Sequence, residues 1–163
     1  MRLGEGVEWA LHCCTVLALM PDGDALPATR LAEFHDVPGP YLAKHLQALS
    51  RAGIIESAPG PRGGYRLARP PAEITLLEVV LAVEGEEPAF RCTEIRRRGP
   101  SAIPAGGYPK PCGIARAMWR AEEAWRGELA AQTIGDLLAG LAVDVDPRAA
   151  LKGAAWFQEV LRR

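Results

Sequence analysis

The alternation of apolar and polar positions is most informative between residues 27 and 70. Leucines spaced i, i+4 and i+7 run through this stretch: Leu42, Leu46 and Leu49. They predict the buried stripe of a helix that begins near Pro40, where a missing N–H has no cost in the first turn. An earlier helix is predicted over about residues 28–35, and the prolines and glycine after Val37 break the pattern between the two. The spacing therefore predicts two short helices joined by a tight turn.

Two strand-like runs follow, over residues 54–57 and 65–68, and the loop between them carries Arg62. Helix, turn, polar-faced helix and two-stranded wing together predict a winged helix-turn-helix, a DNA-binding unit. A generic α+β unit that binds nothing is the alternative, but a glycine-rich hairpin with an arginine at its end favours phosphate or minor-groove contact. The expected DNA-binding residues are Tyr41, Lys44, His45, Gln47 and Arg51 on the polar helix face, with Arg62, Gly63 and Gly64 in the wing.

Helical periodicity also marks both sides of this unit, so we expect a mainly α fold with a small β wing. A first helix is predicted over residues 4–20, and a later one over 75–84 begins with a capping box of Thr75 and Glu78. The buried face expected for the first helix consists of Val7, Ala10, Leu11, Cys14, Leu17 and Ala18. We divide the chain into a winged-helix domain (1–85), a long loop (86–112) and a helical remainder (113–163).

The remainder begins with a predicted helix over residues 113–132. Its apolar residues recur at three- and four-residue spacing: Ile114, Met118, Ala121, Trp125 and Leu129. We interpret the stripe as a dimerisation surface, because paired DNA half-sites favour a two-fold dimer; packing on the first helix of the same chain is the alternative. A short helix is expected over 133–138, and a helical tail with Trp156 and Phe157 is expected to complete the packing.

Charge supports the DNA-binding interpretation. The net charge of the chain is −1, yet residues 28–69 carry six Lys or Arg against three acidic residues, a net of +3. A basic patch on an otherwise acidic chain suits docking on phosphates. No segment is long and apolar enough to span a membrane, and we expect a cytoplasmic protein. Structural disulfides are rare there, so the four cysteines require a core, metal or redox explanation.

Two groups of residues are candidates for metal or redox chemistry. Glu8 and His12 lie four residues apart on the first predicted helix, a spacing that by itself favours a solvated pair over two metal ligands. Cys112 directly precedes a helix, where free N–H groups and the helix dipole stabilise a thiolate. Cys92 stands among polar neighbours, although a buried small residue is the alternative. Trp9, beside Glu8, either belongs to the core or covers a site.

The residues of the recognition helix and wing closely resemble the Rrf2 family of bacterial transcription regulators. The resemblance rests on Tyr41-Leu42, Leu46, Leu49, Ala52-Gly53-Ile54-Ile55, Ser57, Gly60, Gly63-Gly64-Tyr65 and Leu67, and on the helix Thr75-Leu76-Leu77-Glu78-Val79-Val80. It covers roughly residues 1–130. It implies a winged-helix homodimer that binds a DNA operator, and many such regulators sense redox state, nitric oxide or iron–sulfur supply. This chain departs from the family pattern at Pro38, where a serine is usual.

Cluster-binding members usually carry three closely spaced cysteines after the fourth helix. This chain has only Cys92 and then Cys112, with Arg98 where another cysteine is expected. Its pattern resembles members with a [2Fe–2S] cluster, and the resemblance implies ligation by Cys92 and Cys112 of one chain and by Glu8 and His12 of the other. Residues 86–112 are then a cluster-binding loop, and Trp9 is a candidate gate beside the cluster. The implied function is a redox-sensing regulator, expected to act as a repressor.

Two alternatives to a cluster remain. One is a cluster-free regulator switched by a disulfide between Cys92 and Cys112. The other is a zinc-dependent hydrolase that uses Glu8, His12 and the cysteines, but the chain has no His-Glu-x-x-His motif. None of the three serines lies in a nucleophile-elbow sequence, and no nucleotide-binding loop is present. We therefore expect a protein that is not an enzyme.

Overall fold

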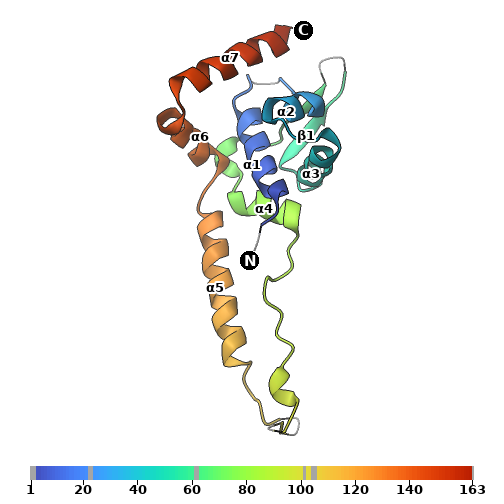
Figure 1. Ribbon diagram of the computed structural model, residues 1–163, viewed down its shortest axis with the longest axis vertical. Helices are drawn as coiled ribbons and strands as arrows, with labels where there is room; N and C mark the ends of the chain where they lie inside the picture. The colour runs from blue at the N-terminus through green and yellow to red at the C-terminus, as the bar shows by residue number, and fades with distance from the viewer. Residues whose placement is uncertain (1–2, 22–23, 61–62, 101, 104–105, 163) are drawn as a thin grey trace.

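The computed structural model describes residues 3–21, 24–60, 63–100, 102–103 and 106–162 (Figure 1). Its elements in chain order are α1 (Glu5–Ala18), α2 (Ala28–His35), α3 (Gly39–Arg51), β1 (Ile55–Ala58), β2 (Gly64–Leu67), the 3₁₀ helix η1 (Pro71–Glu73), α4 (Leu76–Glu84), the 3₁₀ helix η2 (Ile95–Arg97), α5 (Gly113–Ala130), α6 (Ile134–Asp144) and α7 (Pro147–Arg162). The predicted fold class, mainly α with a small β wing, is confirmed. In the described part of the chain, no helix is long and apolar enough to cross a membrane.

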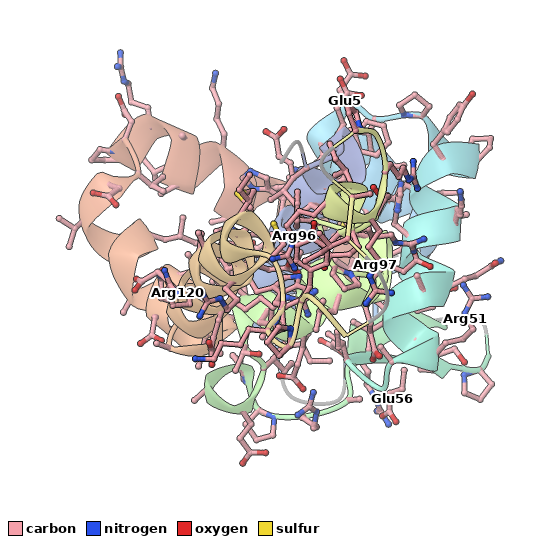
Figure 2. The ribbon with its side chains drawn as sticks, turned by 90° about the horizontal axis from the view of Figure 1, so that it is seen from below. Glu5, Arg51, Glu56, Arg96, Arg97 and Arg120 are labelled. Carbon is pink, nitrogen blue, oxygen red and sulfur yellow. The ribbon has the colours of Figure 1, made fainter. Side chains whose placement is uncertain are left out.

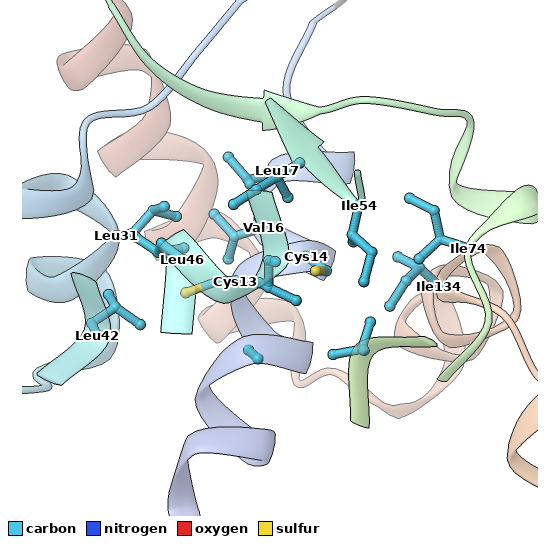
Figure 3. Close-up of a cluster of buried hydrophobic side chains, with 14 of the residues drawn as sticks. Cys13, Cys14, Val16, Leu17, Leu31, Leu42, Leu46, Ile54, Ile74 and Ile134 are labelled. Carbon is cyan, nitrogen blue, oxygen red and sulfur yellow. The ribbon is translucent and has the colours of Figure 1, made fainter. Parts of the chain in front are cut away.

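The hydrophobic core surrounds α1 (Figure 3). The predicted leucine stripe of α3 is fully buried: Leu42, Leu46 and Leu49 each have 0% of their surface exposed. The buried face of α1 is wider than the sequence predicted, because Cys13 and Val16 are buried as well as Cys14. Other helices pack on more than one side of α1, so more of its residues are buried than a single apolar stripe predicts.

The wing is a two-stranded antiparallel sheet whose register runs from Ile55 opposite Leu67 to Ala58 opposite Gly64. Both strands are displaced by one residue from the predicted runs. The base of the wing is held to the chain before α2, because Leu26 and Tyr65 exchange backbone hydrogen bonds of 2.9 and 2.8 Å. A side chain at Gly64 would place its Cβ 2.2 Å from the carbonyl carbon of Leu26, so this close approach requires glycine.

Two capping boxes lie side by side at the starts of α4 and α6. Thr75 and Glu78 form the predicted box, and Thr133 and Asp136 form a second box that was not predicted. Backbone bonds from Leu76 N–H to the Gln132 carbonyl and from Ile134 N–H to the Ile74 carbonyl, both 2.9 Å, tie the two starts together. These bonds hold the start of α6 against the core. The helix continues to Asp144, beyond the predicted end at residue 138.

Residues 86–130, here called the arm, extend away from the rest of the molecule (Figure 1). The loop runs beside α5 and is tied to it where the Ala89 N–H donates to Glu122 at 3.1 Å and Arg126 donates to the Glu86 carbonyl at 3.2 Å. The first part of the predicted apolar stripe of α5 is uncovered in the single chain, with Ile114 68% exposed and Met118 44%, whereas Leu129 at the other end packs against the core.

The C-terminal tail is a single helix, α7, that packs on α2. Phe34 of α2 lies against Trp156 and Phe157 of α7, with ring centroids 4.9 and 5.3 Å apart. The expected packing role of both aromatic residues is confirmed. Through this cluster α7 contacts the helix that precedes the recognition helix.

Candidate nucleic-acid interface and thiol site

The outward face of α3 carries four of the five residues predicted to contact DNA there. Tyr41 is 68% exposed, and Lys44, Gln47 and Arg51 are exposed as well. The face forms because the buried leucines occupy the opposite side of the helix. Two lysine or arginine charges, an amide and a phenol on one exposed helix face can contact both phosphates and base edges.

His45, the fifth, does not have the expected orientation. Its ring fills the space beside Gly6 of α1, where an added Cβ would lie 2.2 Å from the imidazole. The indole of Trp9 meets the same ring edge-on, at 6.1 Å between centroids. The prediction that His45 points away from the core is therefore wrong. The periodicity of α3 could not show it, because the cause is a missing side chain on α1.

Two residues of the predicted DNA-binding set, Gly63 and Gly64, are required by the backbone geometry of the wing. Gly63 N–H donates to the Gly60 carbonyl at 2.8 Å, and a Cβ at Gly63 would lie 2.5 Å from the Ala58 carbonyl oxygen. Gly63 and Gly64 thus shape the hairpin, and their contact with DNA stays a prediction. Arg62 lies outside the described residues. Arg66 forms an exposed ion pair with Glu56 at 2.7 Å across the strands.

Cys92 and Cys112 are both half-buried and share one polar network at the end of the arm. The N–H of Glu94 donates to the Cys92 sulfur at 3.4 Å, and the Glu94 carboxylate pairs with Arg96. Arg96 also donates to the Lys110 carbonyl at 3.1 Å, two residues before Cys112. Residues at both ends of the loop are therefore held together around the two thiols.

Cys112 is the N-cap residue of α5. The backbone N–H groups of Ala115 and Ile114, in the first turn of α5, lower the pKa of its thiol below the ordinary value, and the nearby Arg96 guanidinium acts in the same direction. Cys112 thus lies at a helix N-terminus, as the sequence predicted. By contrast, burial raises the pKa of Cys13 and of Cys14 to about 12, which makes them chemically inert core residues.

Glu8 and His12 are both exposed, one turn apart on α1. The His12 ring lies 5.4 Å from that of His35 in α2. His35 is itself half-buried, with a pKa lowered first by burial and then by the charge of His12. Trp9 is half-buried and packs against the core. Within one chain, the described residues bring no three potential metal ligands together, so the pair on α1 and the pair in the arm remain separate.

Comparison with known proteins identifies the class. The model of the Rrf2 family, described as an iron-dependent transcriptional regulator, matches residues 3–140. The HTH-type transcriptional repressor NsrR of Streptomyces coelicolor is 32% identical over 140 residues, which cover 85% of this chain and 89% of that protein. The HTH-type regulator slr0846 of Synechocystis is 39% identical over 84 residues, 52% of this chain and 57% of that protein. This chain spans about half the length of several such relatives.

The fold agrees with this assignment. The structure of CymR, the global cysteine regulator of B. subtilis, superposes with a TM-score of 0.66 at 21% identity and covers 85% of this chain and 97% of its own. The chain belongs to the Rrf2 family. Its relatives are transcription regulators and not enzymes, which removes the hydrolase alternative.

Proposed function

We propose that this protein is a DNA-binding transcription regulator, acting as a repressor, whose dimer holds a [2Fe–2S] cluster that makes operator binding depend on redox state. The observation that carries the proposal is the pair of half-buried thiols, Cys92 and Cys112, held by one network at the end of the arm. The exposed polar face of α3 and the wing supply the DNA-reading surface.

A dimer through α5 is supported by the uncovered apolar stripe of that helix. Two of its residues, Ile114 and Met118, are each more than 40% exposed in the single chain, and so is the neighbouring Trp119. Apolar residues at this spacing on one helix gain most by packing against a second helix, because burial removes their surface from water. A second copy would also place two α3 helices in a two-fold arrangement suited to a palindromic operator.

The residues present fit an iron–sulfur cluster. Thiolates are its usual ligands, and Cys112 already has a lowered pKa. Because the described residues of one chain do not assemble three ligands, we take the other two, Glu8 and His12, from the partner chain. The spacing of the four residues resembles that in the redox-sensitive regulator RsrR. When bound, the cluster would supply a one-electron couple, whose potential nitrogen ligation raises relative to four thiolates.

The chain itself provides a route from such a site to DNA. Glu8 and His12 lie on α1, and α1 packs directly on α3. A change in how the arm of one chain is held against α1 of the other would therefore shift the position of a recognition helix. Trp9 lies between these features, one residue from Glu8 and in edge contact with His45 of α3. This position is consistent with the gate proposed for it.

The deciding experiment is anaerobic purification followed by an absorption spectrum and assays of iron and sulfide. We expect visible absorption, with two irons and two sulfides per cluster. Cys92→Ala or Cys112→Ala should abolish the cluster, since a thiolate is hard to replace at such sites. Glu8→Ala or His12→Ala should labilise it or shift its potential. Cys13→Ala is the matched control and should retain it, because Cys13 is enclosed in the core.

Operator binding by the oxidised and the reduced protein, measured by fluorescence anisotropy, tests the switch. Equal affinities in the two states would exclude redox control, and loss of the cluster in Cys13→Ala with retention in Cys112→Ala would exclude the ligand set. The second candidate is a disulfide between Cys92 and Cys112, favoured by their shared network. It predicts no iron or sulfide and a mass decrease of two hydrogens on oxidation.

A further inference from the structure

Positive charge is concentrated in the distal part of the arm. Residues 91–120 contain seven Lys or Arg and a single acidic residue, a net charge of +6, whereas the whole chain carries −1. The remaining residues therefore carry −7. This second basic region exceeds that of the winged-helix unit and lies far from it along the arm (Figure 1). We call residues 91–98 and 110–120 the arm tip.

Most of the cations of the arm tip form no ion pair with an acidic residue in the described part of the chain. Arg91 pairs with Glu87 and Arg96 pairs with Glu94. The others are exposed and form no ion pair with any described residue: Arg97, Arg98, Lys110, Arg116 and Arg120. Figure 2, which views the molecule from the tip end of the arm, labels Arg96, Arg97 and Arg120. Cations so closely spaced repel one another unless an anionic surface covers them.

An acidic surface lies where α1 begins and α4 ends. The Gly4 N–H donates to the Glu84 carboxylate at 2.9 Å, which places Glu84 beside the first turn of α1. Glu5 and Glu8 lie three residues apart on one face of that helix, and His12 continues the same face. Glu5, Glu8 and Glu84 are all exposed, and we call them the acid edge.

We propose that the arm tip of one chain docks on the acid edge of a second copy, held by charge complementarity. The inference rests on the dimer of the proposed function and deepens it by naming the surfaces that meet. In one chain the two surfaces lie apart, because the arm carries its tip away from the start of α1 (Figure 1). Across two chains, the same contact brings Cys92 and Cys112 to the helix face of Glu8 and His12.

DNA is the other anionic surface that cations of this kind can bind. The arrangement favours the second copy, because the recognition helix and the wing belong to the body and lie far from the arm tip (Figure 1). The carboxylates of the acid edge would repel DNA phosphates, but they attract arginine side chains.

Charge reversal on both surfaces tests the docking. The tip variant is Arg97→Glu/Arg98→Glu, and the edge variant is Glu5→Lys/Glu84→Lys, which leaves the proposed ligand Glu8 untouched. Each variant homodimer sets like charges against each other, and we expect roughly tenfold weaker dimerisation by sedimentation at low salt. When the two variants are mixed, every tip meets an edge of opposite charge. Native mass spectrometry should then show more heterodimer than random pairing gives.

Three controls keep the test decisive. A chain with all four substitutions should regain dimer affinity, which a variant that merely misfolds would not do. Glu5→Gln/Glu84→Gln keeps an oxygen acceptor for the Gly4 N–H and should weaken dimerisation less than the lysine pair. Lys152→Glu/Arg162→Glu makes the same change in net charge on exposed positions of α7 and should leave the dimer unchanged.

Random pairing in the mixture, with unaltered homodimer affinity, would overturn the proposal. So would a tip variant that dimerises normally but loses operator affinity, since that outcome assigns the arm tip to DNA. All dimer measurements use cluster-free protein, and cluster content is assayed separately. Correct charge pairing in a protein that never holds iron would contradict only the proposed cofactor, whereas iron binding with random pairing would contradict only the docking.

Discussion

The winged-helix body and the arm are stabilised in different ways. We define the body as residues 3–85 together with α6 and α7. Its helices share one core in which residues such as Leu46, Cys14 and Ile134 have no exposed surface. In the arm, Ala115 is the only fully buried residue of α5, and the described loop is held mainly by polar contacts. The body therefore encloses its apolar residues within one chain, whereas the arm leaves apolar and charged side chains exposed.

The largest expected effect concerns the four thiols of cluster-free protein. Cys92 and Cys112 should react with iodoacetamide on the order of a thousandfold faster than Cys13 and Cys14, because access to the latter pair requires opening of the core. The lowered pKa of Cys112 means that its thiolate persists to lower pH, so its rate should rise at lower pH than that of a free cysteine. Mass spectrometry of peptides after timed quenching measures all four sites.

Urea above the unfolding transition is the internal control for that comparison. The difference between the two pairs should vanish there, because burial alone raises the pKa of Cys13. Comparable reactivity of all four cysteines in the native protein would contradict the placement of α1 at the centre of the core.

The next largest difference is expected between the unfolding free energies of two truncation variants, one in the body and one in the arm. Leu46→Ala removes a fully buried side chain and should lower the free energy of unfolding by about 3 kcal/mol. Ile114→Ala removes a side chain that is 68% exposed in the single chain, and it should change that free energy by at most about 0.5 kcal/mol in the monomer. Urea unfolding followed by circular dichroism measures both.

The same two variants separate folding from assembly. Sedimentation should show a weaker dimer for Ile114→Ala and an unaltered monomer fold. If Ile114→Ala destabilised the monomer as much as Leu46→Ala, the arm would have to pack within its own chain.

The smallest loss of stability is expected when either of the two capping boxes of the body is removed. Thr75→Ala removes the acceptor for the Glu78 N–H and should cost about 1 kcal/mol of unfolding free energy. Thr133→Ala removes the matching bond to the Asp136 N–H and should cost a similar amount. Thr75→Ser keeps a hydroxyl acceptor and is the control in the same urea titration. An unaltered stability in both alanine variants would show that the boxes do not stabilise these helix starts.

Local patterns predicted most of the body correctly. The leucine stripe of α3 and the box of Thr75 and Glu78 depend on spacings of three or four residues, which a single helix determines by itself. The second box was not predicted, although Thr133 and Asp136 have the same spacing. The position of Cys112 at a helix N-terminus was likewise predictable from local sequence, because it required only the start of one helix.

Features that depend on two elements were not predictable in this way. The orientation of His45 is set by Gly6 on another helix, and the burial of Cys13 reflects neighbours on several sides of α1. The acid edge joins residues 80 positions apart through the bond between Gly4 and Glu84. The charge of the arm tip is visible in the sequence, but only when residues separated by a long loop are counted together.

The seating of His45 beside Gly6 has a mechanical consequence. A ring lodged where the neighbouring helix lacks a side chain resists sliding, since displacement of α1 by one residue would bring Glu5 or Val7 against the imidazole. Interfaces of this kind move as rigid bodies and do not deform gradually. Any force applied to α1 is therefore transmitted to α3 as a tilt or rotation of the pair, with their relative register preserved.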